Sequence, residues 1–404
     1  MSRDPAIRVW RHRIAEGLLA LFMSGLAACA GPTARDADSN AGVESVATAP
    51  PTLDRRPPLD RGIAWLVANQ NADGSWGSFE SARPGEIYLG TVASHRAFRD
   101  ATSALATMAL IPAATRGNAA AQASLARAVD YLVSTEPSLR ATGDTFYNVW
   151  THTYLVQAAA RLLESGLCAP QSSALRSLLE RERGLLETTQ AADGGWGYYD
   201  FEHAARVPSG EMTTCFNTAS ALLALRDAER IGASYPEART LDAVKVIERL
   251  RLPSGAYVYG TYALYRPTAG FNMVQGSLGR SQPCNLALHL LAGSATIADL
   301  EQGLEALRRD HHYLQIGQGR PRPHEAYYQN SGYYYLYGHW YAAECAALLP
   351  DPKRREYLDW LEGVLREIQN PDGSWIDFPL YGYGHPYGTA FAVLTLETCR
   401  RGRG

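Results

Sequence analysis

Residues 70–76 read Gln-Asn-Ala-Asp-Gly-Ser-Trp, and close copies stand at 190–196 (Gln-Ala-Ala-Asp-Gly-Gly-Trp) and 369–375 (Gln-Asn-Pro-Asp-Gly-Ser-Trp). Each copy ends a helical pattern and precedes a loop rich in aromatic residues. A motif that returns at long and regular intervals indicates a repeat architecture. This motif therefore decides the fold.

The spacing of the copies predicts six repeats. The motif aspartates are Asp73, Asp193 and Asp372, and a degenerate copy at 251–257 has Ser254 in their place. A unit of about 60 residues fits all the intervals if two further copies are silent. These silent copies are expected near residues 133 and 313, where the stretches 131–137 and 307–313 each end an apolar-periodic pattern.

Each unit holds two helical stretches of different character. The stretch before the motif is amphipathic, which is typical of a helix at the surface, whereas the stretch after it is apolar on nearly all faces, which is typical of a buried helix. We therefore predict an all-α fold, an α/α toroid of six helical hairpins with inner and outer rings of six helices each. Pro283 and Pro386 are expected in the first turns of the fourth and sixth inner helices, where a missing N–H costs nothing.

The segment 61–76, Arg-Gly-Ile-Ala-Trp-Leu-Val-Ala-Asn-Gln-Asn-Ala-Asp-Gly-Ser-Trp, resembles the QW repeat of squalene–hopene cyclases and related terpenoid cyclases. The similarity covers residues 59–400. It implies the toroid that these enzymes share with protein prenyltransferases, in which Asp-Gly makes a tight turn while Gln and Trp join the outer ends of neighbouring hairpins. The motif specifies the fold more than the chemistry, because this fold carries several activities.

The N-terminus resembles a bacterial lipoprotein signal peptide. An arginine-rich stretch at 3–13 precedes a short apolar run at 17–28, which is too short to span a membrane. The run ends in Leu-Ala-Ala-Cys, which resembles a lipobox and implies that Cys29 is lipidated, palmitate being a typical acyl group; an ordinary cleavage site is the alternative. We predict a signal peptide at 1–28, a disordered tether at 29–58 and the toroid domain at 59–404.

The predicted location is therefore the periplasmic or cell-surface side of a bacterial membrane, with the lipid anchor as the membrane contact. The formal net charge is only −3, and no basic cluster indicates nucleic acid as a partner. The expected partner is a small molecule, a lipid or a glycan. After Cys29 five cysteines remain, so at least one thiol is expected to be unpaired.

Polar residues near the N-terminal ends of the inner helices are the candidates for a central pocket. Helix capping is the alternative for some of them, and Asp100 and Asn217 suit an N-cap. The candidate catalytic residues are His339, Asp100, His152 and Tyr337. The candidate ligand-binding residues are His95, Arg99, Asn217, Arg280, Tyr334, His385 and Tyr387.

The chemistry of this pocket stays open among several readings. The sequence lacks the D-x-D-D acid with which terpenoid cyclases start cyclisation, and it has no D-D-x-x-D motif for a diphosphate. A polysaccharide lyase would use the tract 331–341 (Ser-Gly-Tyr-Tyr-Tyr-Leu-Tyr-Gly-His-Trp-Tyr) with His339 as the base, and with Arg280 and Asn217 neutralising a uronate. On this reading, replacing His339 by alanine abolishes the activity.

Zinc is a further possibility for a cofactor, and no other cofactor is indicated. The side chains of Cys215, Cys284, His339 and His385 are of the right type for zinc, although a disulfide between Cys215 and Cys284 explains the two thiols equally well. A non-catalytic binder is the remaining alternative, because 23 tyrosines and eight tryptophans suit a surface that stacks on sugars or holds an apolar chain.

Overall fold

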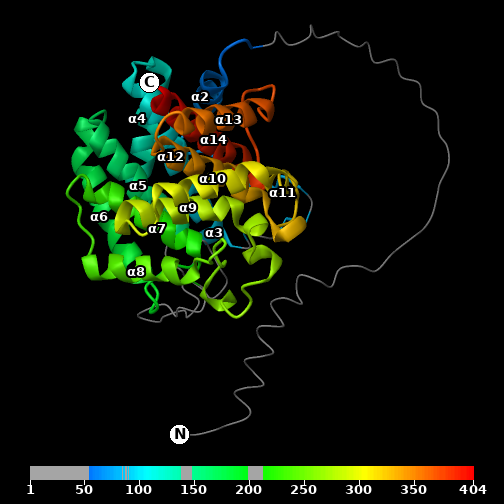
Figure 1. Ribbon diagram of the computed structural model, residues 1–404. Helices are drawn as coiled ribbons and strands as arrows, with labels where there is room; N and C mark the ends of the chain where they lie inside the picture. The colour runs from blue at the N-terminus through cyan, green and yellow to red at the C-terminus, as the bar shows by residue number, and fades with distance from the viewer. Residues whose placement is uncertain (1–53, 84, 87–88, 90, 138–147, 199–212) are drawn as a thin grey trace, which may run out of the picture. The chain divides into compact units, whose positions relative to one another are not determined.

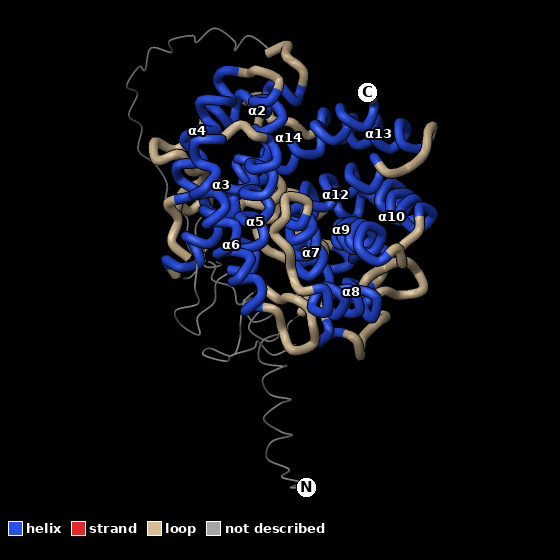
Figure 2. The backbone as a smooth tube through the Cα atoms, turned by 90° about the vertical axis from the view of Figure 1, so that its left-hand side faces the viewer, coloured by secondary structure: helices blue, strands red, loops and turns tan. Residues whose placement is uncertain are grey.

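The structure, a computed structural model, describes residues 54–404 apart from 84, 87–88, 90, 138–147 and 199–212. These residues form helices and no strand, and the helices lie in a body that runs from Leu53 to Gly404 (Figures 1 and 2). Within the described residues, none of the helices combines the length and the apolar character that a membrane span requires.

Six largely buried helices form the inner ring. Each packs against the next one along the chain, and the last packs against the first, so the ring is closed. The inner helices are α3 (Val92–Thr115), α5 (Asn148–Ser165), α7 (Cys215–Glu229), α9 (Val274–Ala292), α12 (Tyr335–Ala347) and α14 (Gly384–Arg403).

Six amphipathic helices surround this ring, and each packs against at least one inner helix. They are α2 (Pro58–Ala68), α4 (Ala119–Val133), α6 (Ser172–Thr189), α8 (Glu237–Leu250), α10 (Ile297–Arg309) and α13 (Lys353–Glu367). A short helix, α11 (His311–Gln315), follows α10. The predicted toroid of six hairpins, inner and outer helices alternating along the chain, is confirmed.

The motif tryptophans connect the two rings. Trp76, Trp196 and Trp375 are fully buried, and each indole N–H donates to the carbonyl ten residues earlier, at the end of an outer helix, over 2.8–2.9 Å. The backbone N–H of each tryptophan donates to a serine or threonine hydroxyl on the following inner helix. Every motif copy therefore fixes one outer helix to one inner helix.

The motif glutamines connect neighbouring outer helices. The side-chain amide of Gln70 donates to the carbonyls of Gly74 in its own turn and Ser124 on α4, and Gln190 bonds Gly194 and Arg239 in the same way. Gln369 in the last copy reaches back to the carbonyl of Pro58 on α2, over 2.9 Å, and so closes the ring. The predicted role of the motif glutamines in joining neighbouring hairpins is confirmed.

Both the backbone conformation and the available space require glycine at position 74 of the turn. Gly74 has a φ of +89°, and an added Cβ would lie 2.2 Å from the carbonyl oxygen of Arg127 on the next outer helix. The degenerate fourth copy keeps this turn, because Ser254 replaces the aspartate as acceptor for the backbone N–H of Ala256. Arg251 stands where the glutamine would be and pairs with Asp299 on the next outer helix.

Two local predictions are wrong because inner helices begin earlier than expected. Pro283 lies inside α9, which starts at Val274, whereas Pro386 does lie in the first turn of α14. Asp100 and Asn217 are not N-caps. The caps of α3 and α7 are Thr91 and Thr214, and each hydroxyl accepts from the backbone N–H of the residue three positions later.

Candidate functional site

Aromatic side chains fill the middle of the inner ring. Tyr337 on α12 contacts the rings of Trp150 on α5, Phe216 on α7 and Phe391 on α14, with centroids 5.9–6.5 Å apart, and its hydroxyl lies 2.8 Å from the Ser220 hydroxyl. Since α5 and α7 do not neighbour α12 along the ring, Tyr337 reaches across the centre. The predicted central pocket is therefore packed at this level, and Tyr337 is part of the packing.

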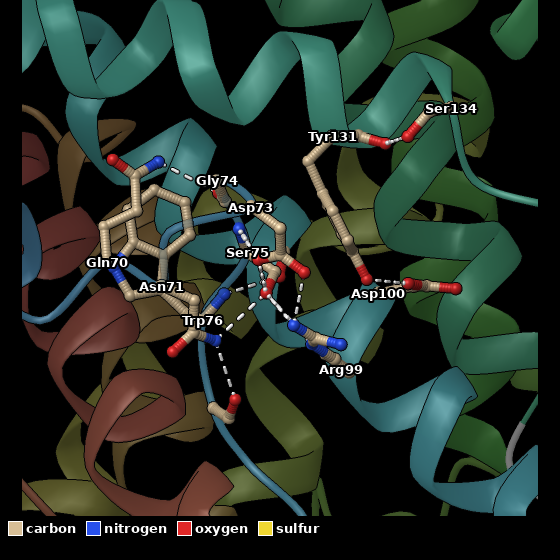
Figure 3. Close-up of polar contacts among 12 residues, drawn as sticks. Gln70, Asn71, Asp73, Gly74, Ser75, Trp76, Arg99, Asp100, Tyr131 and Ser134 are labelled. Atoms are coloured by element: carbon tan, nitrogen blue, oxygen red, sulfur yellow. Dashed lines mark hydrogen bonds and ion pairs between the residues drawn. The ribbon is translucent and has the colours of Figure 1, made fainter.

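Asp100 and Arg99 point outward from α3 instead of into the ring (Figure 3). The Asp100 carboxyl accepts from the Tyr131 hydroxyl on α4 over 2.5 Å, and burial raises its pKa to about 6. Arg99 pairs with Asp73 and donates to the Ser75 hydroxyl, both in the first motif turn. The predicted catalytic role of Asp100 and ligand role of Arg99 gain no support from these positions, which join the two rings.

His152 lies in the same inter-ring layer, fully buried on α5. Its Nδ1 is 2.5 Å from the Glu182 carboxylate on α6. Burial raises the pKa of Glu182, but hydrogen bonds from His152 and Arg181 outweigh it, so that pKa is lowered overall. The other nitrogen of His152 is buried without a hydrogen-bond partner.

His339 is also sealed between the rings. Its Nδ1 contacts the Tyr335 carbonyl at 2.6 Å, and its Nε2 lies 3.0 Å from Nε2 of His311 on α11. The Trp360 ring on α13 is 6.3 Å away. Burial lowers the pKa of His339 to about 3. The prediction that His339 faces a central pocket is wrong, because every one of these contacts is with its own helix or the outer layer.

The four side chains proposed for zinc do not come together. Cys215 is the first residue of α7, and Cys284 lies within the neighbouring helix α9. His339 faces His311, and His385 is exposed beside the Ser374 hydroxyl. Among the described residues no group of three or more metal-ligating side chains is present. Both cysteines are free and fully buried, so the disulfide alternative is not formed either.

His95 lies at the seam between the first and last hairpins. The Tyr383 hydroxyl donates to the His95 carbonyl over 3.0 Å, and the His95 ring stacks with Phe79 and Tyr381 at 4.5–4.6 Å. Desolvation lowers the pKa of His95. Its side chain is half-buried, so His95 stays a candidate contact for a ligand at this seam.

Tyrosines gather where the chain enters α7, α9 and α12, and we call this cluster the tyrosine mouth. The Tyr334 hydroxyl donates to the Tyr259 hydroxyl over 2.9 Å, and the Tyr259 and Tyr198 hydroxyls lie 2.5 Å apart. Tyr262, 40% exposed, meets the Tyr259 ring edge to face, with centroids 6.2 Å apart. The mouth consists of Tyr198, Tyr259, Tyr262, Tyr333, Tyr334 and His324.

The predicted ligand residues reach this mouth unevenly. Tyr334 belongs to it, and the Tyr387 hydroxyl donates to the Tyr333 carbonyl over 3.2 Å. The Arg280 guanidinium lies beneath, 4.7 Å from the centre of the Tyr259 ring and 1% exposed. Asn217 is buried on α7, with its amide nitrogen unpartnered.

His324 was not predicted. It lies in the loop between α11 and α12, and its Nε2 is 3.1 Å from the Tyr333 hydroxyl. Its neighbours in the sequence, Arg-Pro-Arg-Pro at 320–323, follow no pattern that marks a site. The signal that could have found it is the length of this loop, which runs from 316 to 334 and is far longer than a hairpin connection needs.

A hollow in the described surface lies away from this mouth. It has a volume of about 470 Å³, opens at the degenerate fourth repeat, between α8 and α10, and is lined by residues that include Arg251 and Asp299. None of the predicted site residues lines it.

Comparisons with known proteins agree on the architecture. The family model described as squalene-hopene cyclase C-terminal domain matches residues 37–245, about half of the chain. No curated protein matches the chain significantly. The solved type II terpene cyclase MstE from Scytonema is 15% identical with a TM-score of 0.49, covering 86% of this chain and 97% of that one.

Two sugar-handling enzymes have the same fold. The α-1,6-mannanase from Salegentibacter, solved with α-1,6-mannotriose, is 13% identical with a TM-score of 0.54 and covers 85% of this chain and 98% of its own. The cellobiose 2-epimerase from Spirochaeta thermophila is 14% identical with a TM-score of 0.54, with coverages of 87% and 99%. At these identities the likeness shows the α/α toroid alone.

Proposed function

The chain belongs to the squalene–hopene cyclase C-terminal domain family, and we propose that its toroid binds an extracytoplasmic glycan at the tyrosine mouth. The observation that carries the proposal is the hydrogen-bonded series of Tyr334, Tyr259 and Tyr198, with the partly exposed Tyr262 and Tyr333 beside it. Aromatic faces stack on the C–H faces of sugar rings, and phenol hydroxyls both donate to and accept from sugar hydroxyls.

Cyclisation of a polyprene gains no support from this arrangement. A cyclase needs a chamber that folds a long hydrocarbon around a carboxylic acid, but Tyr337 and its aromatic neighbours occupy the middle of the ring. The sequence has no D-x-D-D, and Asp100 is held by Tyr131 in the inter-ring layer. A lyase that uses His339 as its base is not favoured either, because no bound sugar reaches a side chain sealed between α12 and the outer helices.

Two further considerations support a glycan. The structures that share this fold with TM-scores above 0.5 include a mannanase bound to mannotriose and a cellobiose epimerase. The lipobox-like sequence before Cys29 favours an anchor on the outer side of a membrane, where glycans are abundant, although Cys29 lies outside the described residues. Of the predicted ligand residues, Tyr334 then supports this site through its bond to Tyr259, and Tyr387 through its bond to the Tyr333 carbonyl.

The test is a glycan array followed by titration calorimetry with the best ligand. We expect replacement of Tyr262 by alanine to weaken binding about tenfold, which is about 1.4 kcal/mol, because it removes an exposed stacking face. Replacement of Leu241 by alanine is the control, since Leu241 is equally exposed (46%) but lies on the outer helix α8.

Native mass spectrometry of the purified protein adds an independent result. A retained isoprenoid or other lipid mass would contradict a glycan site and return the protein to the apolar ligands of its family. The glycan site is also contradicted if no glycan binds, or if both variants bind as the unaltered protein does.

A further inference from the structure

His324 and Tyr333 form a hydrogen-bonded pair within the tyrosine mouth. The Tyr333 hydroxyl lies 3.1 Å from Nε2 of His324, and the two rings are perpendicular at 6.1 Å. Tyr333 is half-buried and His324 is exposed, so a ligand in the mouth can touch both. The carbonyl of Tyr333 is held by the Tyr387 hydroxyl from α14.

The hydrogen bonds of His324 define which nitrogen is free to accept a proton. Its Nδ1 lies 2.8 Å from the Gln329 carbonyl, which can only accept, so Nδ1 carries the proton and Nε2 is the acceptor. Desolvation and the Arg280 charge lower the pKa of His324, whereas the hydrogen bond to the Gln329 carbonyl raises it; the pKa is lowered overall. Nε2 is therefore the nitrogen that can take up a proton, as a base must.

The loop that carries His324 has a backbone conformation that is unusual for its residue types. His324, Tyr328 and Gln329 have φ values of 61°, 56° and 55°, in the left-handed region that residues other than glycine rarely adopt. The Ser331 hydroxyl fixes the turn by accepting from the His324 backbone N–H over 2.8 Å. Strain of this kind persists where the surrounding structure over-determines it, and such residues cluster at functional sites.

A buried cation lies beneath the tyrosine mouth, against the rings of Tyr259 and Tyr334. Arg280 is bonded to the carbonyls of Gly276 and Phe271, and its Nε has no partner. Among the described residues no carboxylate is paired with it; its ionisable neighbours include the Tyr334 and Tyr259 phenols and the Cys215 thiol. A charge in a low-dielectric interior acts over several ångströms, so the mouth favours a ligand that brings or develops negative charge.

From these contacts we infer that the tyrosine mouth is a proton-transfer site for acidic glycans, in which Tyr333 and His324 carry out β-elimination on a uronate. The inference rests on the proposed glycan site and adds the charge of the ligand and the reaction.

The reaction needs no further reactant. Tyr333 passes its hydroxyl proton to Nε2 of His324 and takes the proton from the sugar carbon next to the carboxylate. The electron pair of that C–H bond forms a carbon–carbon double bond, and the adjacent C–O bond to the leaving sugar breaks. The leaving oxygen takes a proton back from the pair, so the enzyme ends as it began. The field of Arg280 stabilises the negative charge that develops on the carboxylate during this step.

The test uses the full chain with a panel of polyuronates, including polygalacturonate, alginate and hyaluronan. Binding is measured by affinity electrophoresis, and elimination by the ultraviolet absorbance of the unsaturated uronate product. We expect at least one polyuronate to bind and to yield this product. Tyr333→Phe should lower the rate at least about a hundredfold while changing the affinity less than about threefold.

Tyr327→Phe is the matched control, because Tyr327 lies in the same loop, is 72% exposed and should leave the rate unchanged. His324→Gln, which retains an acceptor but cannot hold the proton, should lose the rate as Tyr333→Phe does. Binding without an unsaturated product, or a Tyr333→Phe protein of full activity, overturns the elimination and leaves the glycan site standing. If no glycan of any charge binds, the proposed function fails together with the inference.

Discussion

Replacement of Trp375 by phenylalanine tests whether the motif holds the ring together in the way its geometry indicates. Trp375 is fully buried, and its indole N–H donates to the Leu365 carbonyl at the end of α13 over 2.8 Å. Phenylalanine keeps an aromatic ring but removes the donor and part of the volume. Trp76 and Trp196 have the same burial and the same bond.

The expected cost has two parts. The lost ring volume leaves a small cavity, at about 1–2 kcal/mol. The buried Leu365 carbonyl loses its partner, and because it belongs to the last turn of a helix it has no other, at about 1–3 kcal/mol. Together they give about 2–5 kcal/mol for each of the three tryptophans. Trp65→Phe is the control, since the indole of Trp65 bonds only an exposed carboxylate, that of Asp372, and should cost less than about 1 kcal/mol.

The assay is urea unfolding followed by circular dichroism on the unaltered protein and the four variants. The three motif variants should shift the midpoint by similar amounts, and the control should shift it little. If Trp375→Phe shifts the midpoint no more than Trp65→Phe does, the motif does not act through the buried indole and the reasoning fails. If one motif variant differs from the others by more than about 2 kcal/mol, the repeats are not equivalent supports.

Two other predictions concern buried titratable groups. Burial raises the pKa of Asp377 to about 7, so between about pH 4 and pH 7 the folded protein keeps this proton while the unfolded chain loses it. Asp377→Asn should therefore stabilise the protein by at most about 4 kcal/mol above pH 7, and the gain should shrink to nothing near pH 4. Thermal unfolding measured as a function of pH checks this. A gain independent of pH would refute the assignment. His339→Ala should cost about 2–4 kcal/mol in thermal unfolding because His339 is packed between the rings, yet leave glycan binding of the folded protein unchanged; lost binding in a folded variant would contradict its placement.

The sequence predicted the architecture because the motif encodes it directly. Trp76, Gly74 and Gln70 each have one structural task, and the three tasks together fix the outer turn of a hairpin. The two silent copies are predicted by the spacing alone. Helix starts such as that of α9 were missed because Pro283 is tolerated inside a helix whose neighbours hold it.

The candidate site was predicted less well, for a physical reason. An inner helix that is apolar on nearly all faces does not reveal which face looks at the ring centre. His152 lies near the start of α5 and Asp100 well inside α3, and both turn toward outer helices, where Glu182 and Tyr131 are their hydrogen-bond partners. Aromatic residues such as Tyr337 occupy the centre of the ring instead, and they need few polar partners.

The position of the tyrosine mouth follows from the repeat, and a signal for it is present in the sequence. Tyr198 stands two residues after the motif aromatic Trp196, and Tyr259 stands two residues after its counterpart Tyr257. Because the motif turn fixes the chain at the end of an outer helix, the residues that follow it lead to the start of an inner helix. The same position in the last copy is Asp377, a buried carboxyl whose backbone carbonyl accepts from Gly319 in the loop that bears His324.

Residues at this position therefore differ between repeats although the turn before them does not. A conserved turn is what a ring of equal hairpins needs, whereas a binding site on a six-fold scaffold must break the equality at some positions. Side chains carried by connecting loops can vary without disturbing the staples between helices. The chemistry of this toroid is accordingly expected in the loops that follow the motif and in the long loop before α12, more than on the inner helices themselves.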